Sequence, residues 1–98
     1  MFVEKNKIVQ IITENILIKR LKYNAEELSG ITNDESLADR LSLSSIDEFE
    51  MILGVEDEFE IDLSAIDQDE LHEHFRTIET MAGFIQGELA LQLNREAN

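Results

Sequence analysis

The chain has 98 residues, of which 43% are apolar and 31% charged, with no proline and no cysteine. A chain of this length folds as one domain with a single small core, which favours a binding or carrier module over an enzyme with a deep cleft. The absence of cysteine excludes disulfides and thiolate metal sites, and no apolar run is long enough for a signal peptide or a membrane span. We therefore expect a cytoplasmic, helical, non-catalytic domain.

The formal net charge of −14 is divided unevenly along the chain. Residues 1–22 contain five basic and two acidic residues, so the negative charge belongs entirely to residues 23–98. Such a charge repels nucleic acid phosphates and favours basic protein surfaces as partners. An acidic surface also simply keeps small domains soluble, so the charge alone identifies no function.

Four isoleucines predict a first helix over residues 3–22. They are spaced at i, i+3, i+4 and i+8, which places them on one helix face: Ile8, Ile11, Ile12 and Ile16. Lys19, Arg20 and Lys22 suit the C-terminal end of this helix, where the helix dipole favours cations.

Residues 23–44 are rich in serine, asparagine, glycine and aspartate, and their apolar residues are too scattered for one long helix. We expect a long ordered loop. Loops of this length are uncommon in compact domains unless they are functional or held in place. The residues expected to hold this loop to the core are Leu28, Ile31, Leu37, Leu41 and Leu43.

A second helix is predicted from Ser44 or Ser45 to about residue 59, because a serine with an acidic residue three positions later can satisfy the free amides of the first turn. One side of this helix carries Met51, Ile52, Val55 and Phe59. Another side combines apolar and acidic residues: Ile46, Asp47, Phe49, Glu50, Leu53 and Asp57. Periodicity leaves two alternatives open, a partner-facing second side or a helix covered on all sides.

A short helix is predicted from Asp67, with Glu70 at the capping-box position, and a last helix from Thr77 to about Leu91. The tail from Asn94 is expected to be frayed. The whole chain is thus predicted to be a single all-α domain over residues 1–98. Its expected architecture is a four-helix bundle, three longer helices and one short one, with a long loop between helices 1 and 2.

Several kinds of site find little support. His72 and His74 are two residues apart and point in different directions on a helix, so a surface pair is the better interpretation than a metal site. The acidic run Glu56–Asp62 lacks the central glycine of a calcium loop. No glycine-rich phosphate loop is present, and no third group completes a catalytic arrangement around Ser45. Local sequence alone favours Ser45 as a simple helix cap.

The wider sequence context of Ser45 changes that interpretation. The run LSLSSIDEFEMILGVEDEF, from Leu41 to Phe59, resembles the attachment site and acidic second helix of acyl carrier proteins, in which an Asp-Ser-Leu-Asp motif precedes the helix. Upstream, ESLADRL from Glu35 resembles the segment that leads into the motif. Downstream, TIETMAGFI from Thr77 resembles the family's last helix. The resemblance is collinear over most of the chain and implies the family's four-helix fold.

The resemblance implies that Ser45 carries 4′-phosphopantetheine. A holo-carrier-protein synthase, or phosphopantetheinyl transferase, would transfer this group from coenzyme A, and its thiol would hold acyl groups as thioesters. The implied partners are synthase and acyl-transferring enzymes of fatty acid, polyketide or related biosynthesis that carry basic docking patches. The positions that match the family's partner-binding surface are Ile46, Asp47, Phe49, Glu50, Leu53, Glu56 and Asp57. A monomer is the expected state of such a shuttle.

The sequence also departs from the family pattern. Ser44 and Ile46 replace the usual aspartate and leucine beside the attachment serine, and Arg40 replaces a commonly acidic residue. The segment around His72–Phe75 is about three residues longer than usual, which indicates a specialised carrier. Ser44 is the alternative acceptor, although Ser45 has the matching Ile-Asp after it. The alternative function is an unmodified binding module that uses its acidic second helix to scaffold or regulate a basic partner.

Overall fold

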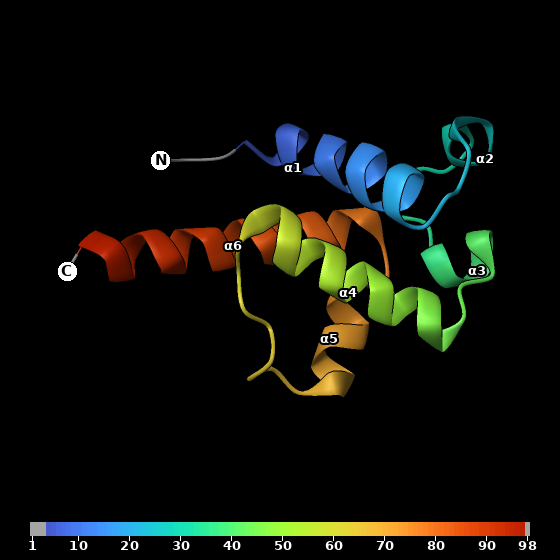
Figure 1. Ribbon diagram of the computed structural model, residues 1–98. Coiled ribbons are helices and arrows are strands. Elements are labelled where there is room, and N and C mark those ends of the chain that lie inside the picture. Colours follow the sequence, from blue (N-terminus) through green and yellow to red (C-terminus); the bar gives the residue numbers. More distant parts are fainter. Residues whose placement is uncertain (1–3, 98) are drawn as a thin grey trace.

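The computed structural model describes the backbone of residues 4–97 and the side chains of residues 4–92. Within these residues every regular element is helical (Figure 1), as predicted. The elements are α1 (Lys5–Ile11), η1 (Ile12–Arg20), α2 (Ala25–Ser29), α3 (Leu37–Leu41), α4 (Ser45–Phe59), α5 (Gln68–His74) and α6 (Ile78–Ala97). None of the described helices is long and apolar enough to cross a membrane.

The predicted first helix is present as α1 followed directly by η1, which is a π-helix. Three isoleucines of the predicted stripe, Ile8, Ile12 and Ile16, are fully buried, and the fourth, Ile11, is partly buried and packs against the core. Leu17 is fully buried as well, although α-helical periodicity did not select it. In a π-helix residues five apart are hydrogen-bonded neighbours, so Leu17 joins Ile12 on the core side. The predicted start at Val3 lies outside the described residues.

Close contact between η1 and α4 depends on Gly54, which is buried. A Cβ atom on Gly54 would lie 3.2 Å from Cγ2 of Ile16 and 3.0 Å from Cδ of Arg20. Only glycine therefore allows the two helices to approach this closely without displacing a neighbour. On the same side of α4, Met51 and Val55 are fully buried.

The connection between η1 and α4 differs from the predicted loop, because it contains the two short helices α2 and α3. Each begins with a polar side chain that accepts a backbone hydrogen bond, Asn24 from Glu27 and Ser36 from Asp39. These local caps allow five-residue helices that a search for long periodicity misses. The expected anchoring is confirmed for the apolar residues of this connection, which are buried or packed against the core: Leu28, Ile31, Leu37, Leu41 and Leu43.

Two backbone hydrogen bonds fix this connection to the other end of the chain. The amide of Leu37 donates to the carbonyl of Arg76 (2.9 Å), and the amide of Glu79 donates to the carbonyl of Asn33 (2.8 Å). Arg40, at the position that is usually acidic, forms an ion pair with Glu35 (3.1 Å). The connection is thus an ordered part of the fold that leads directly into α4.

The last two helices complete the core. Asp67 caps α5 as predicted, but its side chain accepts from the amide of Asp69, and the expected partnership with Glu70 is absent. Thr77 caps α6, since its hydroxyl accepts from the amide of Thr80 (2.9 Å). The helix continues to Ala97, beyond the predicted end near Leu91. Asn98, the end of the tail expected to be frayed, lies outside the described residues.

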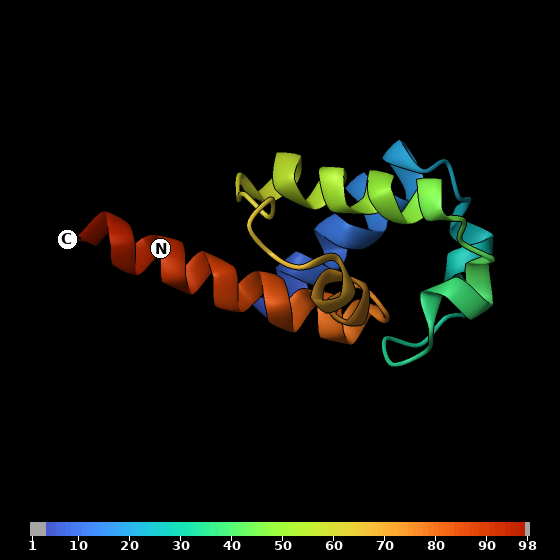
Figure 2. The ribbon, with the colours of Figure 1, turned by 90° about the horizontal axis from the view of Figure 1, so that it is seen from below.

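The helices enclose one apolar core that draws residues from every element. α6 packs against α1, α4 and α5, and η1 packs against α4. The C-terminal half of α6 projects beyond the other helices (Figure 2), which gives the molecule extents of 43 × 26 × 21 Å. The buried apolar residues include Ile8, Ile12, Ile16, Leu17, Leu37, Met51, Val55, Leu63, Leu71, Phe75, Met81, Ala82 and Ile85.

Candidate functional site

The two adjacent serines at the start of α4 have different roles. The Ser44 hydroxyl accepts from the amide of Asp47 (3.1 Å), and the Asp47 carboxylate accepts from the amide of Ser44 (3.1 Å). This reciprocal pair is a complete capping box. Ser45 is the first residue of α4 and is exposed, and its hydroxyl has no hydrogen-bond partner among the described residues. The interpretation of Ser45 as a simple cap is therefore wrong, because Ser44 is the cap.

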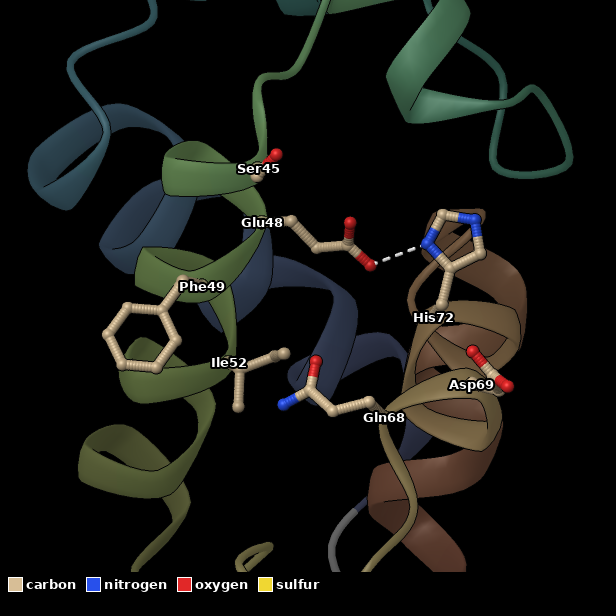
Figure 3. A pocket seen from close by; sticks show the side chains of 7 residues that line it. All are labelled: Ser45, Glu48, Phe49, Ile52, Gln68, Asp69 and His72. Atoms are coloured by element: carbon tan, nitrogen blue, oxygen red, sulfur yellow. Dashed lines mark hydrogen bonds and ion pairs between the residues drawn. The ribbon is translucent and has the colours of Figure 1, made fainter.

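A hollow of about 240 Å³ lies beside Ser45, between α4 and α5. Ser45, Glu48, Phe49 and Ile52 of α4 form one wall, and Gln68, Asp69 and His72 of α5 form the other. Figure 3 shows the side chains of Ile52 and Gln68 in the space between the helices, while the ring of Phe49 points away from α5. The free hydroxyl thus stands at the edge of a cleft with mixed polar and apolar walls.

An ion pair links the two walls of this hollow. Nδ1 of His72 lies 2.8 Å from Oε1 of Glu48 (Figure 3). The hydrogen bond and negative charge of Glu48 raise the pKa of the His72 imidazole above its ordinary value of 6.5. The neighbouring His74 stacks instead on Phe84, with ring centroids 4.2 Å apart. The two histidines therefore point in different directions, and the described residues contain no cluster able to hold a metal ion.

A second hollow of about 170 Å³ continues along the same side of α4. It shares Phe49, Ile52 and Gln68 with the first. Its other lining residues are mostly apolar: Leu53, Glu56, Leu63, Ser64, Ile66 and Leu71. The surface beside α4 thus changes from mixed polar and apolar near Ser45 to mostly apolar further along the helix.

The apolar residues predicted to face a partner are accessible. Ile46 is 75% exposed and Phe49 is 55% exposed, whereas Leu53 is half-buried in the wall of the second hollow. Large apolar side chains exposed side by side on one helix are unusual unless they meet a partner. The structure resolves the ambiguity of the two-sided helix: one apolar side is buried and the other is open.

The four acidic residues predicted for the same surface all have partners within the chain. Asp47 belongs to the capping box, and Glu56 accepts from the amide of Leu63 (2.8 Å). Glu50 and Asp57 both pair with Arg20, at 3.3 and 3.0 Å. These carboxylates therefore stabilise the fold locally as well as forming the acidic border of the exposed face.

Sequence reasoning missed three groups that the structure brings to the site. The predictions placed neither Arg20 nor His72 there, and they considered Glu48 only as a possible cap partner. The charge pattern contains one signal for Arg20: it lies at the basic end of the first helix, and the rest of the chain is acidic. No sequence signal indicates that His72 faces Glu48, because that contact depends on how α5 packs.

The fold and the site define a small helical domain with an accessible serine at the head of an acidic amphipathic helix. The chain is 35% identical over 82 residues to acyl carrier proteins from three strains of Buchnera aphidicola subsp. Acyrthosiphon pisum, Tuc7, 5A and APS. The alignment covers 84% of this chain and 88% of each relative. The chain belongs to the acyl carrier protein family, and these relatives indicate a carrier rather than a catalyst. No family model and no solved structure matches it.

Proposed function

We propose that this protein carries acyl groups on a 4′-phosphopantetheine attached to Ser45 and delivers them to enzymes of fatty acid, polyketide or related biosynthesis. The observation that carries the proposal is the division of roles between the two serines. Because Ser44 already caps α4, the hydroxyl of Ser45 is unused, exposed and at the N-terminal end of a 15-residue helix. Modification of the Ser45 hydroxyl would disturb no hydrogen bond among the residues that the structure describes.

The surroundings of Ser45 fit such a group. The phosphate would lie near the free amides and positive dipole end of the first turn of α4, where an anion is favoured. Gln68 and His72 provide hydrogen-bond donors on the facing wall of the hollow. When bound, the group supplies a thiol that holds the acyl chain as a thioester. The apolar second hollow, with Leu53, Leu63, Ile66 and Leu71, offers a place to shield that chain from water.

The exposed face of α4 is the proposed contact surface for the phosphopantetheinyl transferase and for later partner enzymes. Ile46 and Phe49 supply its apolar centre, and Leu53 extends it toward the second hollow. Asp47, Glu50, Glu56 and Asp57 border it with negative charge. Charge complementarity with a basic partner would speed the encounter without making the complex long-lived, as a shuttle requires.

The test is intact mass after incubation of the chain with coenzyme A, magnesium and a broad-specificity phosphopantetheinyl transferase. We expect a phosphopantetheine-sized gain that Ser45→Ala abolishes. The matched control is Ser44→Ala, which should keep the gain but lose about 1 kcal/mol of stability with its helix cap. A gain that persists in Ser45→Ala and disappears in Ser44→Ala would show that Ser44 is the attachment serine and would overturn the assignment to Ser45. No gain with any transferase would favour the unmodified binding module.

A further inference from the structure

The side chain of Arg20, the last residue of η1, packs against α4 at Gly54. Gly54 has no side chain, and an added Cβ there would meet Cδ of Arg20 at 3.0 Å. The aliphatic stem of Arg20 therefore rests against the backbone of α4, and its side chain is only 31% exposed. The guanidinium is held on this helix by packing as well as by charge.

From this position Arg20 bridges two carboxylates. Its Nε lies 3.3 Å from Oε2 of Glu50, and its Nη1 lies 3.0 Å from Oδ2 of Asp57. Glu50 and Asp57 are seven residues apart and so share one side of α4. Their side chains remain 45% and 68% exposed, which leaves both within reach of a cation from outside.

We propose that Arg20 competes with the cations of partner proteins for the carboxylates of Glu50 and Asp57. This competition would determine which partners α4 accepts. This inference rests on the proposed docking role of α4. A partner arginine that approaches Glu50 or Asp57 meets a carboxylate whose charge is already partly neutralised by a guanidinium at high effective concentration, so it gains less from the contact. A partner that relies mainly on a basic patch loses affinity by this competition. A partner with an apolar pocket for Ile46 and Phe49 does not lose affinity in this way. The chain therefore favours partners that bind through an apolar pocket.

A peptide titration tests the competition without any need for a known partner. Arg20→Gln is compared with Lys19→Gln, which removes the same charge one residue away. The side chain of Lys19 is exposed and makes no hydrogen bond or ion pair among the described residues. Tetra-arginine is added to ¹⁵N-labelled protein, and the dissociation constant is read from the amide shifts of Glu50 and Asp57.

We expect Arg20→Gln to bind tetra-arginine about two- to fivefold more tightly at these two residues than Lys19→Gln does, the range given by surface ion pairs. The difference should shrink when the ionic strength is raised, because exposed charges are screened. Equal dissociation constants for the two variants would overturn the inference. This result does not depend on whether Ser45 is modified.

The transferase reaction gives the second readout. We expect Arg20→Gln to lower the KM of the chain for a transferase with a basic docking patch by a similar factor, whereas Lys19→Gln leaves it unchanged or lowers it much less. Modification of Ser45 with the same KM in both variants would contradict the competition while leaving the carrier function intact. Absence of modification would contradict the carrier function, and the peptide titration would still decide the role of Arg20.

Discussion

The two apolar sides of α4 contain similar residues, but one side is buried in the core and the other is exposed to solvent. Met51 and Val55 are fully buried against η1 and the rest of the core, whereas Ile46 and Phe49, on the same helix, are 75% and 55% exposed. Hydrophobicity alone does not distinguish the two sets. The comparison shows that a side of a helix becomes a core side or an open side according to what packs on it, and among residues 4–97 no other element covers Ile46 and Phe49.

The largest expected effect tests this contrast directly. Met51→Ala should reduce the free energy of unfolding by about 2–5 kcal/mol, because it removes buried apolar volume and leaves a cavity. Phe49→Ala, on the open side, should cost less than about 1 kcal/mol. Urea unfolding followed by circular dichroism measures both. Equal losses would mean that Phe49 is packed in solution and that the open side does not exist.

A smaller effect concerns the side of α4 that contacts η1. Gly54→Ala should lower stability by about 1 kcal/mol, because crowding against Ile16 and Arg20 outweighs the better helix propensity of alanine. The matched control is Gly87→Ala in α6, where an added Cβ meets nothing within 4 Å. That substitution should raise stability by about 0.5–1 kcal/mol. A gain at Gly54 as large as that at Gly87 would show that α4 and η1 do not approach so closely.

The smallest effect concerns the ion pair between His72 and Glu48 at the edge of the open side. Because the folded state raises the pKa of His72, the pair stabilises the fold below about pH 6.5 and loses this contribution as the pH rises through the folded pKa. The stability of the wild type relative to His72→Gln should therefore fall from pH 6 to pH 8.

An NMR titration of the His72 ring isolates the cause of this pH dependence. Glu48→Gln removes the negative charge and should bring the pKa of His72 down toward its ordinary value. If His72 titrates identically with and without the Glu48 carboxylate, the two walls of the hollow are not linked in solution.

Most of the fold was predictable because its signals are local. The isoleucine stripe, the start of α4 at the two serines and the caps at Asp67 and Thr77 each depend on residues close in sequence, so they follow from the sequence. The connection after η1 was the main error. Its helices α2 and α3 are too short to show a period, and backbone hydrogen bonds to Arg76 and Glu79 hold the connection in place.

The candidate site was predictable in its composition and only partly in its arrangement. The motif around Ser45 indicated the serine and the exposed Ile46 and Phe49. It did not show that Ser44 would form the cap, because both serines have an acidic residue three positions later. Nor could it show that Arg20 pairs with Glu50 and Asp57, since this contact joins residues 30 and 37 positions apart.

The sequence by itself determined the helical class, the family and the acidic character of α4, because periodicity, caps and net charge are properties of neighbouring residues. Only the tertiary structure decided which side of α4 is open and which carboxylates are already paired with Arg20. These outcomes depend on the close packing of η1 against Gly54 and on the hollow between α4 and α5. Such contacts between distant segments are fixed by how whole helices fit together, which no local pattern encodes.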